Sequence, residues 1–173
     1  VVSGYSKECL KLMQTIYKTI SKKVFSTNTL EEAETSKLLE NLYRSINIAL
    51  ANEMKLICSK LKINVHNVIE TASTKNFGFQ KFVPGPGLGG HCIPIDPYYL
   101  SWISEKKGYG PLLLKSAAKI NNNMPKIITN KILKYFERKP RILIFGISYK
   151  KNVDDDRESP SFEFMKIFKK RGI

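Results

Sequence analysis

The sequence predicts a mainly helical protein that ends in the first strand and helix of an α/β domain. Over most of the chain, apolar residues recur at steps of three and four, which is the pattern of amphipathic helices. After residue 140 the pattern changes to a short apolar run, residues 141–146, which ends in a glycine as a buried parallel strand does. We therefore predict a helical domain over residues 1–137 and the start of a Rossmann-like α/β domain over residues 138–173.

Six helices are expected along the chain. They cover residues 5–21, 29–61, a short stretch after Asn64, a stretch from Asp96 onward, residues 111–136 with a bend or break at Pro125, and residues 159–172. Thr29 and Glu32 match the capping box of the second helix, and Asp96 is the expected N-cap of the fourth, with Pro97 at its first position. The second helix lacks internal proline and glycine, so it is long enough to form the backbone of a domain or the seam of a dimer.

Composition and length describe a folded protein. The 173 residues are 42% hydrophobic and 25% charged, unlike disordered chains. No apolar run reaches the roughly 20 residues of a membrane-spanning helix, and no signal-peptide pattern is present, so we expect no membrane partner. Three cysteines without a CxxC pair favour a reducing cytoplasm and no structural metal. Cys9 and Cys58 lie among apolar residues at helical spacing, and both are expected to be buried.

The chain is basic, with 29 lysines and arginines against 15 aspartates and glutamates, which gives a formal net charge of +14. Such a charge suits nucleic acid, anionic lipid or an anionic small substrate. The lysines are dispersed, however, and no RNA-binding or zinc-finger signature is present. We interpret them as an exposed lysine-rich surface and expect no nucleic-acid partner. Salt-dependent association with random duplex would favour the alternative.

The candidate nucleophile is Cys92. It follows a stretch rich in glycine and proline, residues 84–90, whose glycines let the backbone approach a ligand closely. It also lies in the turn before a predicted helix, where backbone amides and the helix dipole favour a thiolate. A structural cysteine in a tight turn is the alternative interpretation. His91 is interpreted as a neighbour of the nucleophile rather than as a catalyst.

Two polar residues on the long predicted helix are candidates for stabilising negative charge. Lys37 and Asn41 are four residues apart and share one helix face with Arg44. A cation and an amide donor in line can hold the charge that develops on an oxygen, as an oxyanion hole does, if the cysteine loop packs against them. A solvated helix face is the alternative.

Three ordered motifs resemble those of the UDP-glucose/GDP-mannose dehydrogenase superfamily, the four-electron oxidases of nucleotide sugars. Residues 34–41 (ETSKLLEN) are similar to the helix motif of that family, and residues 89–92 (GGHC) with Asp96 are similar to its nucleophile loop. Residues 145–151 (FGISYKK) and 156–159 (DRES) are similar to the beginning of its third domain. The resemblance spans nearly the whole chain. It implies a central, dimer-forming helical domain followed by the start of a UDP-sugar-binding domain.

The resemblance also implies a role for particular residues. Cys92 would be the nucleophile, Lys37 and Asn41 would stabilise oxyanions, and Asp96 would position or activate water. Arg157 would contact the cofactor, NAD, and no residue is implied as a metal ligand. The residues implied to bind the nucleotide sugar are Phe82, Val83, Pro84, Gly85, Pro86, Gly87, Leu88, Gly89, Tyr149 and Lys150.

The implied reaction is oxidation of the C6 hydroxyl of a UDP-sugar to the uronic acid, through a thiohemiacetal and a thioester on Cys92, in the synthesis of surface polysaccharides. The motif around Cys92 is more similar to the branch that acts on UDP-N-acetylhexosamines, with UDP-N-acetylglucosamine first. UDP-N-acetylmannosamine, UDP-N-acetylgalactosamine and UDP-glucose stay open as substrates. A homodimer through the long helix is also implied. A non-catalytic helical dimerisation module is the alternative from a different functional class.

Enzymes of this family begin with an NAD-binding domain that carries a G-x-G-x-x-G motif after its first strand, and no predicted strand in these 173 residues is followed by such a motif. The third domain is represented by one strand and one helix. We therefore expect the amino-terminal NAD-binding domain to be absent from this chain, and these residues alone to turn over no substrate.

Overall fold

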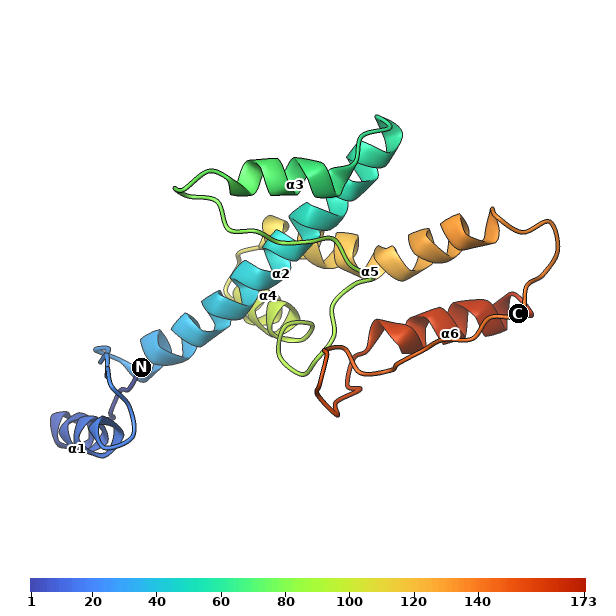
Figure 1. Cartoon of the computed structure of the whole chain (residues 1–173). Coiled ribbons are helices and arrows are strands. Elements are labelled where there is room, and N and C mark those ends of the chain that lie inside the picture. The colour runs from blue at the N-terminus through green and yellow to red at the C-terminus, as the bar shows by residue number, and fades with distance from the viewer. The chain divides into compact units, whose positions relative to one another are not determined.

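Six helices make up the regular secondary structure of the protein (Figure 1). The computed structural model describes all 173 residues, Val1–Ile173. The helices are α1 (Lys7–Lys18), α2 (Leu30–Lys60), α3 (Val65–Ser73), α4 (Asp96–Lys106), α5 (Leu112–Leu133) and α6 (Pro160–Lys170). The prediction of a mainly helical protein is confirmed. None of these helices combines the length and the apolar character that crossing a lipid bilayer requires.

The chain divides into two compact units, Val1–Asn41 and Leu42–Ile173, and α2 runs through both. In the first unit the side chain of Ser6 caps α1 by accepting a hydrogen bond from the N–H of Cys9 at 3.2 Å. No residue of α1 is buried, so Cys9 is exposed and the expectation that it lies in a core is wrong. Spacing alone could not show this, because an amphipathic stripe is buried only where another surface covers it.

The predicted capping box at the start of α2 is confirmed. The N–H of Glu32 donates to Thr29 Oγ1 at 3.1 Å, and the N–H of Thr29 donates to Glu32 Oε2 at 3.2 Å. The same carboxylate accepts from the N–H of Asn28 at 2.8 Å. These bonds pair amides that the helix start would otherwise leave without a partner. The 31-residue helix therefore begins where the sequence predicts.

In the second unit, α3 packs against the C-terminal end of α2. Cys58, Val65 and Ile69 form a buried cluster, and Met54 packs against it. Asn64 caps α3 as predicted, because its Oδ1 accepts from the N–H of His66 at 2.9 Å. Figure 1 shows α3 folded back beside the end of α2. Cys58 is therefore a buried cysteine, as expected.

Two fully buried asparagines join α2 to α5. Asn52 Nδ2 donates to Asn121 Oδ1 at 3.0 Å, and Asn121 Nδ2 donates to the backbone carbonyl of Ser45 at 3.0 Å. Asn52 Oδ1 accepts from the N–H of Gly85 in the glycine-rich loop at 2.8 Å. Both asparagines are 0% exposed, and a buried amide is tolerated only where its polar atoms are paired. The pair therefore aligns α2 with α5 and ties the loop to both.

The helix α5 continues through Pro125, so the predicted interruption is not a break. Proline has no N–H, and the carbonyl of Asn121, four residues earlier, thereby loses its usual helical donor. Gly87 lies against that carbonyl, since a Cβ added to Gly87 would stand 3.3 Å from the Asn121 oxygen. The φ of Gly87 is +135°, which also favours glycine. The glycine-rich loop therefore passes α5 beside the turn that the proline interrupts.

Residues 141–146 do not form the predicted strand, and the only β pairing in the chain is a single bridge between Val2 and Ser26. A strand is stabilised by hydrogen bonds to a neighbouring strand, and no other segment of the chain pairs with this one. The run is also not buried as predicted. Leu143 is 75% exposed and Phe145 is 89% exposed, whereas Ile142 and Ile144 are half-buried. Exposed and half-buried residues alternate along residues 141–145 as in a strand, but this segment has no neighbouring strand to pair with.

The last helix, α6, packs against α5 within the second unit. It begins as predicted, with Pro160 at its first position and Ser159 Oγ accepting from the N–H of Ser161 at 3.3 Å. At its end Arg171 donates to the side chain of Asn130 on α5. The predicted domain boundary between residues 137 and 138 falls inside this unit and stays a prediction.

Replacing Asn121 by leucine is expected to lower the free energy of unfolding by about 1–3 kcal/mol, because Asn52 Nδ2 would be left buried without an acceptor. Urea unfolding followed by circular dichroism measures the change. Asn123→Leu, an exposed neighbour on the same helix, is the matched control and should be close to neutral. Equal effects of the two substitutions would show that the buried amide pair contributes nothing to stability.

Candidate active site

Cys92 lies in the turn that leads into α4, as predicted, and its side chain is exposed. The backbone carbonyl of Cys92 accepts from the N–H of Ile95 at 3.0 Å and from the N–H of Asp96 at 2.9 Å. These bonds start the helix at Asp96, with Ile95 as N-cap. The prediction that Asp96 is the N-cap is therefore wrong by one residue. The amides of Tyr98 and Tyr99, which a capping Asp96 would bond, donate instead to the carbonyl of Ile95 at 3.0 and 3.2 Å.

Asp96 is half-buried in the first turn of α4, and Pro97 follows it as predicted. Negative charge is favoured in this place, because the amides of the first turn point toward it. The carboxylate therefore lies four residues beyond Cys92 at the same end of α4. Its action on a water molecule stays a prediction.

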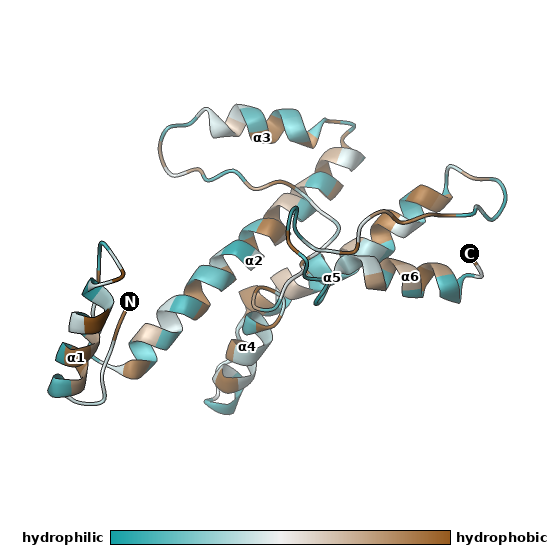
Figure 2. Ribbon diagram, turned by 60° about the horizontal axis from the view of Figure 1, so that its bottom comes forward, coloured by the Kyte–Doolittle hydropathy of each residue, from teal (hydrophilic) through white to brown (hydrophobic).

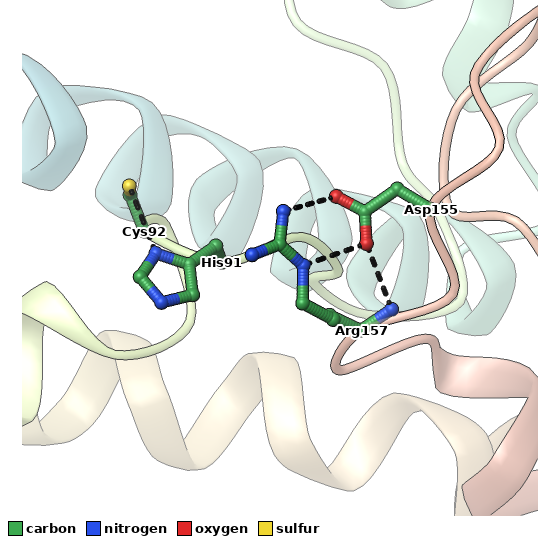
Figure 3. Close-up of polar contacts among 4 residues, drawn as sticks. All are labelled: His91, Cys92, Asp155 and Arg157. Carbon is green, nitrogen blue, oxygen red and sulfur yellow. Dashed lines mark hydrogen bonds and ion pairs between the residues drawn. The ribbon is translucent and has the colours of Figure 1, made fainter.

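His91 is in contact with the candidate nucleophile. Its Nδ1 lies 3.7 Å from Cys92 Sγ, and both side chains are exposed (Figure 3). Figure 3 shows the guanidinium of Arg157 on the other side of His91, held by Asp155. The thiol and the imidazole thus form one contact, and the arginine and the aspartate form another, both within the second unit.

Arg157 and Asp155 form a forked ion pair. Arg157 Nε donates to Asp155 Oδ1 at 2.9 Å, and Arg157 Nη2 donates to Asp155 Oδ2 at 2.7 Å. The bonds from Arg157 lower the pKa of Asp155 to about 2, and the charge of His91 adds a small contribution in the same direction. The pKa of Arg157 is raised, mainly by Asp155 and to a smaller extent by Tyr149 and Cys92.

The turn before Cys92 is held by the segment that contains Arg157. The N–H of Gly90 donates to the carbonyl of Arg157 at 2.9 Å. The ring of Tyr149 covers Gly89 and Gly90, and a Cβ added to Gly90, where φ is +94°, would stand 2.9 Å from that ring. Only glycine fits such a contact. The structure therefore brings Tyr149 and Arg157 to the turn before Cys92, although they are far from it in sequence.

The remaining predicted sugar-binding residues belong mostly to the glycine-rich loop. Phe82, two residues before this loop, packs edge-on against Tyr43 of α2, with ring centres 6.0 Å apart. Gly87 and Leu88 border a cavity of about 450 Å³ that α5 and the start of α6 complete. A larger cavity of about 760 Å³ lies among α2, α3 and α5 but contains none of the predicted site residues. Lys150 is exposed beyond Tyr149.

Lys37 and Asn41 occupy neighbouring turns of α2 in the first unit. Lys37 is exposed and forms an ion pair with Glu40, with Nζ 2.9 Å from Oε2. Asn41 is only 3% exposed, so the alternative of a fully solvated helix face does not hold for it. Cys92 belongs to the second unit, and the meeting of these groups with the thiol stays a prediction.

Sequence reasoning missed three residues that organise this site: Asn52, Asn121 and Asp155. A signal for Asn121 was present, since Ala117, Asn121 and Met124 follow the spacing of a buried stripe on α5. An asparagine inside an apolar stripe implies a buried partner. Asp155 gave no comparable signal, because it is one of three consecutive aspartates.

Comparison with known proteins gives a family match over more than half of the chain. The model for the central domain of the UDP-glucose/GDP-mannose dehydrogenase family matches residues 31–123. A UDP-N-acetyl-D-mannosamine dehydrogenase from Methanococcus maripaludis is 39% identical over 99% of the chain. Protein CapL from Staphylococcus aureus is 32% identical over 100% of it. The chain spans 40% and 42% of the lengths of these two relatives.

Solved structures show the same similarity. A UDP-D-ManNAc dehydrogenase from Pyrococcus horikoshii aligns over 95% of the chain and 40% of that protein, with a TM-score of 0.84 and 35% identity. A UDP-glucose dehydrogenase from Pyrobaculum islandicum aligns over 97% of the chain and 39% of that protein, with a TM-score of 0.89 and 24% identity. At that identity the second similarity is evidence of the shared fold alone.

Replacing Arg157 by glutamine is expected to return the pKa of Asp155 from about 2 toward its ordinary value of 3.8, because the charged fork is lost. The carboxyl carbon shift of Asp155 in an acid NMR titration measures it. Since the folded pKa lies below the ordinary value, the stabilisation is present above that value and is lost as pH falls through about 2. An unchanged midpoint in Arg157→Gln would contradict the assigned cause.

Proposed function

Because the chain belongs to the UDP-glucose/GDP-mannose dehydrogenase family and matches its central domain, we propose that it takes part in the NAD-dependent oxidation of a UDP-sugar to the uronic acid. The observation that supports this most directly is Cys92, an exposed thiol between a glycine-rich loop and α4, in a turn whose Gly90 is hydrogen-bonded to Arg157. Since the chain spans about 40% of the length of its relatives, the proposed activity is that of the full-length gene product.

Cys92 acts as a covalent catalyst in this proposal. Removal of two electrons from the C6 alcohol gives an aldehyde, and the thiolate of Cys92 adds to the aldehyde carbon to form a thiohemiacetal. Removal of two more electrons gives a thioester. Water then attacks the thioester carbon, the carbon–sulfur bond breaks, and the carboxylate leaves while the thiol is restored. One sugar therefore consumes one water and reduces two NAD.

Lys37, Asn41 and Asp96 support the steps at Cys92. The cation and the amide donor on α2 stabilise the charge that collects on the former aldehyde oxygen in both tetrahedral states. Asp96, in the first turn of α4, orients the water that attacks the thioester. The burial of Asn41 favours this role, because a buried amide is held in one orientation.

NAD, when bound, supplies the hydride acceptor for both oxidations. Within this chain Arg157 is the residue that fits such a group. Its side chain is 60% exposed, and two of its five N–H donors are used by Asp155. The other donors can bind an anionic group of the cofactor, such as its pyrophosphate. Arg157 would therefore hold the cofactor next to the turn that presents Cys92.

A UDP-N-acetylhexosamine is the proposed substrate. The motif around Cys92 places UDP-N-acetylglucosamine first, whereas the relatives from Methanococcus maripaludis and Pyrococcus horikoshii are named for N-acetylmannosamine. Their identity to this chain favours UDP-N-acetylmannosamine, and we propose it as the first sugar to test. The residues proposed to surround the sugar and phosphates are Phe82, Val83, Pro84, Gly85, Pro86, Gly87, Leu88, Gly89, Tyr149 and Lys150.

A second copy of the chain is the proposed protein partner, with α2 at the interface. Figure 2 shows apolar residues recurring along this helix. Tyr43, Leu50 and Ile57 follow one another at intervals of seven and are 47%, 55% and 45% exposed. Apolar residues at that interval form one line on a helix, which is the pattern of a helix pair. If no oxidation is found, a helical dimerisation module is the remaining function.

The full-length gene product is expected to form two NADH per UDP-N-acetylmannosamine consumed, and Cys92→Ala should abolish the release of uronic acid, because no thioester can form. NADH absorbance together with chromatography of the sugar measures both. Cys9→Ser is the matched control, since Cys9 is also exposed and has no role in the proposal. Formation of uronic acid at full yield by the Cys92→Ala variant would contradict the covalent mechanism.

Leu50→Glu is expected to weaken self-association at least about tenfold, because each interface would bury two charged groups in place of apolar surface. Sedimentation over a range of concentrations measures the dissociation constant. Ser59→Glu adds the same charge at an exposed position of α2 off this line and should leave association unchanged. A wild-type chain that is monomeric at high concentration would rule the interface out.

A further inference from the structure

Asp155 lies in the segment that is hydrogen-bonded to the turn before Cys92. Besides the two side-chain bonds from Arg157, its Oδ1 accepts from the backbone N–H of Arg157 at 3.1 Å. Its backbone carbonyl accepts from the N–H of Tyr149 at 3.3 Å. The side chain is only 14% exposed, whereas that of Arg157 is 60% exposed. Asp155 therefore fixes both the backbone and the side chain of Arg157 and is also bonded to Tyr149.

The contacts continue from these two residues to the turn before Cys92. The carbonyl of Arg157 holds the N–H of Gly90, and the ring of Tyr149 covers Gly89 and Gly90. Asp155 thus bonds to both residues that hold the turn. Cys92 follows Gly90 by two residues, so a shift of the turn would move the thiol.

Of the three consecutive aspartates, Asp155 is the one whose carboxylate accepts hydrogen bonds from Arg157. Asp154 and Asp156 are exposed, and Asp156 contributes its backbone carbonyl to the N–H of Ser159 at 3.0 Å. The two oxygens of Asp155 match the planar fork of the guanidinium, which gives the pair a fixed geometry as well as charge. An asparagine would keep the shape but lose the charge and one acceptor.

We propose that Asp155 is a positioning residue, which fixes the side chain and the backbone of Arg157 together and so links the cofactor-binding arginine to the turn that presents Cys92. The part of this inference that concerns the cofactor rests on the proposed function. The part that concerns the turn rests on the bonds of Asp155, Arg157 and Gly90 alone. Two separate measurements therefore test it.

The first measurement is amide hydrogen exchange of Gly90 in the 173-residue chain, followed by NMR. In Asp155→Asn this amide should exchange up to about tenfold faster than in the wild type, since the carbonyl that accepts its bond is no longer held. Asp154→Asn is the matched control and should leave the rate of Gly90 unchanged. Equal Gly90 rates in the wild type and Asp155→Asn would overturn the proposal. Arg157→Lys, which keeps the charge but not the fork, serves as a second variant and should also speed exchange.

The second measurement is a double-mutant cycle on the KM for NAD in the full-length gene product. Asp155→Asn should raise this KM about tenfold with a smaller change in kcat, because Arg157 would lose the charged partner that holds its side chain in place. In an Arg157→Ala background the same substitution should add less than about twofold. An equal effect in both backgrounds would show that Asp155 does not act through Arg157. If the wild type oxidises no nucleotide sugar, the proposed function fails, and Gly90 exchange still decides the positioning role.

Discussion

The buried amide pair of Asn52 and Asn121 is the interaction on which the arrangement of the second unit depends. Each side chain lies on a different helix, and neither has any exposed surface. Their polar atoms must therefore be paired within the protein, which restricts how α2 and α5 can pack. The side-chain nitrogen of Asn52 bonds to Asn121, and its side-chain oxygen accepts from the N–H of Gly85. The register of two helices and the position of the glycine-rich loop are thus set by the same group of hydrogen bonds.

A second anchor holds the other end of that loop. Gly90 is bonded to Arg157, and Asp155 holds Arg157 in place. Between the two anchors, Gly87 passes close to α5 beside the carbonyl that Pro125 leaves without a helical donor. The loop is therefore fixed at both ends, while its glycines leave the backbone open to close approach. Cys92, the proposed nucleophile, follows two residues after Gly90, and an ordered turn would lower the cost of aligning it with a substrate.

Much of this architecture could be predicted from local signals. The capping box of α2, the Asn64 cap of α3 and the turn before α4 each depend on residues that are close in sequence, and each is confirmed. Burial at residues 141–146 and at Cys9 was predicted wrongly, because burial and strand pairing depend on surfaces far away in the sequence. The Asn52–Asn121 pair and the Asp155–Arg157–Gly90 contacts lay beyond local reasoning for the same reason. The roles of Cys92, Lys37, Asn41 and Asp96 stay predictions that the family membership supports.

The central claim is that a buried side chain of α2 holds the glycine-rich loop in place. Amide hydrogen exchange of Gly85 in the folded wild-type chain tests it most directly, with Gly78, an exposed glycine of the segment after α3, as the reference. The bond to Asn52 predicts that Gly85 exchanges at least about a hundredfold more slowly than Gly78. Exchange of Gly85 at the rate of Gly78 would mean that the loop is not anchored and would contradict the account.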